Sequence, residues 1–166
     1  MPGVITTDQL AIYLQDHVAG ARAGVELARR ARDAHEGTEL GDFLVKLAED
    51  IDDDRKALES IMRRLDVAKQ PLKVAAAWTA EKAGRLKPNG RLLSRAPLST
   101  VVELEGLIVG VTGKRELWRS LAQIAPDQPR LDEAEIAELE ARAQNQLRGL
   151  TRHHKKAAAW AFGEAD

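Results

Sequence analysis

The segment from Leu98 to Leu121 constrains the fold more than any other part of the chain. It reads LSTVVELEGLIVGVTGKRELWRSL, and at the angular step of a helix its first half is apolar around most of its circumference. A helix that is apolar nearly all round belongs inside a bundle, with partners on several sides. Glu103 and Glu105 lie in this apolar part, and buried carboxylates are costly unless they are paired or bound to a metal. The sequence therefore predicts that any special chemistry is centred on this helix.

The rest of the chain shows helical periodicity and no strand-like segment. Apolar positions recur at helical spacing from about Thr7 to Ala34 and from a cap at Thr38 to about Leu65, and a capping-box-like start at Asp132 opens the last helix. Pro71 can begin a short extra helix in the long connection before Leu98. We therefore predict an all-α fold with one domain over residues 1–166, a four-helix bundle with an extra helix between its second and third long helices.

Composition excludes several classes of protein. The net charge is −1 and there is no cysteine, so the chain has no global attraction for polyanions, no disulfide, no thiolate nucleophile and no cysteine-based zinc site. The first residues, MPGVITTDQL, lack the basic start and apolar run of a secretory signal. No uninterrupted apolar stretch approaches the length of a membrane span. We expect a cytoplasmic protein with no membrane span.

Two polar side chains are predicted to face the core. His17 lies at the centre of the apolar face of the first helix, where it is either a hydrogen-bonded core histidine or a metal ligand. The acidic run from Glu49 to Asp54 falls mostly on the outer face of the second helix, but Asp54 lies between Ile51 and Leu58 on the buried stripe. We favour a buried ion pair for Asp54, with an Arg or His from another helix.

The stretch from Lys82 to Arg95 is the most basic part of the chain. It is either a solvated connector that balances the acidic second helix or a patch that binds anions, nucleic acid or a membrane surface. Base stacking in nucleic-acid sites uses aromatic side chains between the basic ones, and this stretch has none. We therefore expect no nucleic-acid binding.

Three segments resemble a known group of proteins. YLQDHVAGARAGVELA, DDDRKALESIMRRL and KVAAAWTAEKAGRLKPNGRLL are similar to segments of small, largely uncharacterised bacterial ferritin-like proteins, some of them linked to stress responses. The resemblance covers most of the chain and implies a ferritin-like four-helix bundle. The di-iron branch of that fold uses one Glu on each of two helices and Glu-x-x-His on the other two, and no Glu-x-x-His occurs in this sequence.

Two hypotheses about function remain at this point. The first is a non-catalytic ferritin-like bundle that forms a homodimer or binds a protein partner, with no cofactor. The second is a metal-binding protein or oxidoreductase with a degenerate site made by His17, Asp54 and Glu105. Two or three such ligands would suffice for one weakly bound divalent metal ion, so a mononuclear site stays open.

Overall fold

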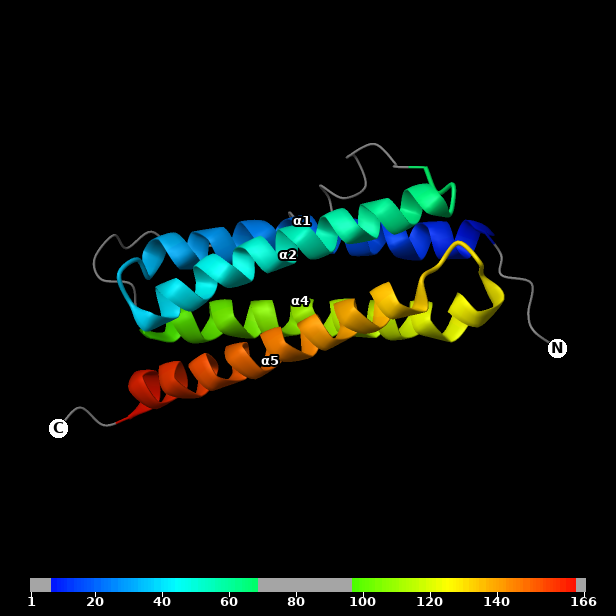
Figure 1. Ribbon diagram of the computed structural model, residues 1–166. Helices are drawn as coiled ribbons and strands as arrows, with labels where there is room; N and C mark the ends of the chain where they lie inside the picture. The colour runs from blue at the N-terminus through cyan, green and yellow to red at the C-terminus, as the bar shows by residue number, and fades with distance from the viewer. Residues whose placement is uncertain (1–6, 69–96, 164–166) are drawn as a thin grey trace.

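Every regular element in the described part of the chain is a helix, as predicted. The computed structural model describes residues 7–68 and 97–163 (Figure 1). Its elements are α1 (Thr7–Ala34), α2 (Glu39–Arg64), α4 (Pro97–Ile124), the 3₁₀ turn η1 (Ala125–Asp127) and α5 (Glu133–Phe162). None of the helices in these ranges has the length and apolar character needed to cross a membrane. The extra helix predicted from Pro71 and the basic stretch from Lys82 to Arg95 lie outside the described residues.

The helix ends are set by local caps. The Thr38 side chain accepts a hydrogen bond from the Gly41 N–H at 3.0 Å and so caps α2. Gly37 in the preceding turn has φ +76°, in the left-handed region that favours glycine. A Cβ on Gly41 would lie 2.1 Å from the His35 carbonyl oxygen, so the tight turn between α1 and α2 also requires glycine there. Asp132 caps α5 by accepting from two backbone N–H groups of its first turn.

The helices form two antiparallel pairs that stack on each other. α1 packs along α2 and α4 packs along α5, while α1 lies against α4 and contact between α2 and α5 is sparse (Figure 1). α2 and α4 run in the same direction, so α2 ends at the opposite end of the bundle from the start of α4. Residues 69–96 make this connection, which is the long crossover that the sequence predicted. The result is a bundle with four main helices in its described part.

Apolar side chains from all four helices fill the core, mostly those predicted from periodicity. Buried members include Leu14 and Val25 of α1, Leu44, Ile51 and Leu58 of α2, Leu104, Leu107, Val111 and Trp118 of α4, and Ile136, Leu139 and Leu150 of α5. The expectation that α4 is surrounded on several sides is wrong for part of its circumference. Val102 is 37% exposed and Val109 67% exposed, because α4 packs mainly on two neighbours, α5 and α1.

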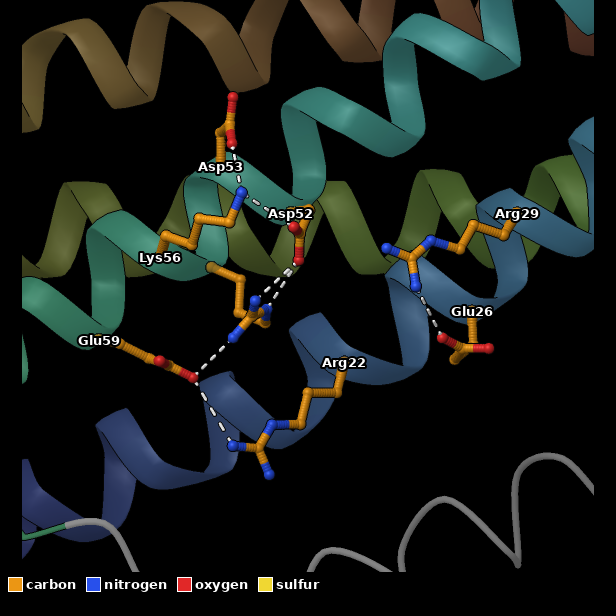
Figure 2. A network of polar contacts seen from close by, with 8 residues as sticks. Arg22, Glu26, Arg29, Asp52, Asp53, Lys56 and Glu59 are labelled. Atoms are coloured by element: carbon orange, nitrogen blue, oxygen red, sulfur yellow. Dashed lines mark hydrogen bonds and ion pairs between the residues drawn. The ribbon is translucent and has the colours of Figure 1, made fainter.

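An ion-pair network joins α1 to α2 on the outside of the bundle. Figure 2 shows Arg22 of α1 reaching Glu59 of α2, at 3.6 Å. The Arg55 guanidinium lies 2.8 Å from Glu59 and 2.9 Å from Asp52. Its hydrogen bonds, with those of Lys56, hold the pKa of Asp52 below its usual value. Most of the acidic run on α2 therefore lies on the outer face, as predicted, where several of its members form ion pairs, and only Asp54 is fully buried.

Candidate functional site: a buried polar cluster

Asp54 is the centre of a polar cluster at the middle of the bundle. Its side chain is 1% exposed, and it lies on the α2 face that looks towards α4 and α5. Lys114 Nζ of α4 donates to Asp54 Oδ2 at 2.5 Å, and Arg142 Nη2 of α5 lies 2.6 Å from Asp54 Oδ1. We call Asp54, Lys114, Arg142 and Gln146 the polar cluster. The prediction that Asp54 is buried and paired with an Arg or His from another helix is confirmed.

Gln146 closes the cluster. Its amide nitrogen donates to Asp54 Oδ2 at 3.1 Å, and its Oε1 accepts from Lys114 Nζ at 2.5 Å. Gln146 is only 4% exposed, so both of these bonds form away from water. Because a buried charge needs partners, the triangle of Asp54, Lys114 and Gln146 satisfies Asp54 Oδ2, while Oδ1 is paired with Arg142. The cluster also links α2 to α5, two helices that otherwise touch little.

The cluster carries an excess of positive charge when its lysine is protonated. One carboxylate faces two cationic side chains, Lys114 and Arg142. Burial lowers the pKa of the Lys114 ammonium below its usual value, against the opposing attraction of Asp54. Arg142 keeps 39% of its side chain exposed, whereas Lys114 keeps 11%, so Lys114 is the cation that depends on Asp54. Two cations beside a single carboxylate repel a metal cation from the same place.

The three metal-ligand candidates do not converge in the structure. His17 and Asp54 line the same cavity, and burial lowers the pKa of the His17 imidazole. Glu105 instead keeps 57% of its side chain exposed and lies 3.1 Å from His154 Nε2 of α5. Among the described residues, no three His, Asp or Glu side chains form a group suited to a metal ion. The apolar part of α4 thus holds no buried carboxylate at Glu105, which turns outward.

His17 and the two adjacent histidines of α5 have ordinary structural surroundings. His17 is half-buried, and its ring contacts that of Tyr13 edge-on, with centroids 4.6 Å apart. His153 is 4% exposed and packs against Phe43, with ring centroids 4.6 Å apart. His154 points elsewhere and pairs with Glu105. Adjacent residues of a helix point in different directions, so the sequence predicts that only one of His153 and His154 faces inward, and His153 is that residue.

Sequence reasoning missed the cations of the cluster. The sequence pattern alone puts Lys114 towards the exposed end of its helix and puts Arg55 and Arg115 among the inward polar candidates. In the structure Arg55 belongs to the α1–α2 surface network, and Arg115 contacts Glu116 and Gln144. The available signal was the spacing of Arg142 and Gln146, which are four residues apart and therefore share a face of α5.

A cavity of about 730 Å³ adjoins the polar cluster between α1, α2 and α4. Its described lining includes Asp54 and Lys114 on one side, with Leu107, Val111 and Trp118 as apolar wall. Gly20 and Gly24 of α1 and Gly106, Gly110 and Gly113 of α4 line it as well. This volume falls in the range of about 300–1,000 Å³ found for small-molecule sites. The arrangement can hold a ligand, whereas a redox metal centre has no matching set of side chains here.

No protein-family model, curated protein or solved structure shows a significant match to this chain.

Proposed function

We propose that this protein is a ferritin-like bundle that acts by binding, without catalysis, and that its interior works without a metal centre. One observation carries this proposal: the inward carboxylate at the middle of the bundle, Asp54, is already engaged by two cations and an amide. A di-iron centre needs several carboxylates at one level, completed by histidines. The polar cluster instead offers one carboxylate with two cationic side chains.

The order of helix directions supports the ferritin-like part of the proposal. α1 is antiparallel to α2, α2 runs parallel to α4, and α4 is antiparallel to α5 (Figure 1). A bundle of this kind needs one long connection, and ferritin-like folds have one. The extra helix from Pro71 in this connection is part of the same proposal. On the resemblance of its sequence segments, we extend the proposal to a cytoplasmic bacterial protein with a stress-related role.

A mononuclear metal site is the second candidate. His17 and Asp54 line one cavity, and the lowered pKa of His17 favours the neutral imidazole that a metal ion requires. The nearby Lys114 and Arg142 act against it, because they repel a divalent ion and compete for the same carboxylate. This candidate therefore ranks below metal-free binding.

Iron loading tests the first proposal against the second. Purified protein is incubated anaerobically with excess Fe(II), freed of unbound iron and exposed to oxygen. We expect no absorbance from an oxo-bridged product. Iron at about two equivalents per chain with oxygen-dependent absorbance would overturn the proposal. If one ion binds, His17→Ala should weaken it, whereas the matched variant His153→Ala should not, because His153 packs against Phe43 away from the cavity.

Self-association belongs to the proposal as well. Leu98 and Val102 lie one turn apart on α4 and are 54% and 37% exposed. Neither belongs to the described lining of the cavity. Exposed apolar side chains grouped on one helix face favour contact with another protein surface. We propose a homodimer, or a complex with a protein partner, through this face of α4.

A further inference from the structure

The start of α2 and the C-terminal part of α5 lie at the same end of the bundle and meet through an aromatic contact (Figure 1). The ring centroids of Phe43 on α2 and His153 on α5 are 4.6 Å apart. Beside this contact, Lys156 Nζ of α5 lies 2.8 Å from Glu39 Oε2 of α2. Because contact between α2 and α5 is sparse, each of these contacts carries much of the connection between the two helices.

Gly149 makes room for the Phe43 ring. A Cβ on Gly149 would lie 2.4 Å from Phe43 Cε2 and 2.8 Å from Cζ, so any larger side chain there must displace the ring. Gly149 precedes His153 by four residues, so both lie on the face of α5 that meets α2. Phe43 is therefore held in a notch of α5 that Gly149 and His153 form together.

His153 fits this notch as a neutral imidazole. It is 4% exposed, and its Nε2 is buried without a hydrogen-bond partner among the described residues. A protonated imidazole has an N–H donor on both nitrogens, so protonation would bury a donor without an acceptor. Burial of the charge lowers the pKa of His153. Among the described residues, the charged groups that act on it are Arg152 and Lys156 of α5, which lower the pKa further, and Glu39 of α2, which opposes them.

The other polar contacts between α2 and α5 in the described residues contain no histidine. Arg64 of α2 pairs with Glu135 of α5 towards the opposite end, and the polar cluster joins the two helices at the middle. The Lys156 ammonium lowers the pKa of Glu39 below its usual value, so Glu39 stays ionised between about pH 5 and 7. A proton taken up at this seam in that pH range therefore acts at His153.

We propose that Phe43, Gly149 and His153 form an acid-sensitive latch between α2 and α5. In mildly acidic solution His153 takes up a proton, Phe43 leaves the notch, and the start of α2 separates from the C-terminal part of α5. The polar cluster keeps the middle of the two helices joined. Opening adds the Phe43 ring to the exposed Trp160 and Phe162 at the end of α5, so acidity increases the apolar surface at this end of the bundle.

The latch lies apart from the polar cluster and from the α4 face at Leu98 and Val102, so it goes beyond the proposed function. Iron loading and self-association do not bear on it. Conversely, a latch that stays closed in acid leaves both of those proposals standing.

Amide hydrogen exchange of the full chain measures the opening, with rates corrected for the pH dependence of exchange itself. A helix end that loses its packing partner opens locally, which lowers the protection of its amides. Each unit by which the pKa of His153 in the open form exceeds that in the closed form raises the open population by up to about tenfold in acid. From about pH 7 to 5 we expect protection in residues 42–46 and 154–159 to fall by at least about threefold, and less in residues 139–147.

An NMR titration of the imidazole signals over the same pH range gives the pKa of His153 in the folded chain. We expect a midpoint below 6.5. A midpoint at or above 6.5 would overturn the proposal. So would protection that falls equally along the whole of α5, because the bundle would then open as one unit.

Three variants complete the test. His153→Gln keeps a polar side chain that does not titrate, and it should abolish the fall in protection. His154→Gln is the matched control and should respond to acid as the wild type does, because His154 pairs with Glu105 away from the notch. Gly149→Ala is the second variant should His153→Gln fail to fold, and its methyl group displaces Phe43, so both helix ends should be poorly protected even at about pH 7. An acid response in His153→Gln equal to that of the wild type, or wild-type protection in Gly149→Ala, would overturn the latch.

Discussion

Asp54→Ala tests the energetic role of the polar cluster. The substitution removes a carboxylate that is 1% exposed and leaves its partners behind. Arg142, with 39% of its side chain exposed, can turn into water. Lys114, with 11% exposed, cannot do so easily, and it loses the carboxylate with which it pairs among the described residues. The cost therefore comes mainly from a buried lysine without its counter-charge.

The expected loss is about 3–5 kcal/mol of unfolding free energy, as for breaking other buried ion pairs. It should depend on pH. Without Asp54 the pKa of Lys114 falls further, because the carboxylate was raising it. A lysine whose folded pKa lies below its unfolded value costs stability while it is protonated, so stability rises as pH increases through the folded pKa. The deficit of Asp54→Ala should therefore shrink towards alkaline pH.

The assay is urea unfolding followed by circular dichroism, with thermal melts alongside. At about 2–4 °C per kcal/mol for a chain of this size, the melting temperature should fall by roughly 6–20 °C. Asp53→Ala is the matched control, because Asp53 is 61% exposed and pairs with the exposed Lys56, so its loss should stay within about 1 kcal/mol. A loss for Asp54→Ala no larger than for Asp53→Ala would refute the reasoning.

Three further predictions concern pH, glycine and association. Burial lowers the pKa of His17 and His153 below 6.5, so each imidazole takes up a proton more readily in the unfolded chain than in the folded one. The free energy of unfolding should therefore decrease as pH falls from 6.5 through the folded pKa values. Urea melts between about pH 5 and 7 should show that the unfolding free energy of the double variant His17→Gln, His153→Gln changes less with pH than that of the wild type. An equal change with pH in both proteins would contradict this. Gly41→Ala should destabilise by about 1–3 kcal/mol through its clash with a backbone carbonyl, whereas Gly110→Ala should stabilise by about 0.5–1 kcal/mol. In thermal melts the melting temperature should fall for Gly41→Ala and rise for Gly110→Ala, and changes of the same sign would contradict this prediction. Sedimentation at micromolar concentration should give a dimer that Val102→Lys dissociates, and a monomeric wild type would count against the association.

The helices could be predicted from sequence because their signals are local. Apolar spacing and caps at Thr38 and Asp132 depend on residues within a few positions of each other. Asp54 could be placed inward for the same reason, since Ile51 and Leu58 on either side of it define the buried stripe. The fold class and the burial of this carboxylate therefore followed from the pattern alone.

The partners of Asp54 depend on contacts across the bundle, which a local pattern does not contain. Lys114 lies 60 residues away along the chain, and Gln146 lies 92 residues away. The sequence pattern puts Lys114 towards the exposed end of its helix and contains no sign of a carboxylate on another helix. The spacing of Gly106 and Gly110 predicts a close helix contact, which holds at Gly106, whereas the space beside Gly110 among the described residues depends on how α1 is placed. The partners of Asp54 and the space beside Gly110 both depend on how the helices are placed relative to one another.

Elemental analysis of the chain purified without a metal-affinity tag tests the central claim most directly. The claim is that Lys114 and Arg142 already neutralise the interior carboxylate, so that the bundle needs no metal. Mass spectrometry of the digested protein should find every transition metal far below one equivalent per chain, with the same result for Asp54→Asn. A stoichiometric metal in the wild type that Asp54→Asn loses would contradict the claim.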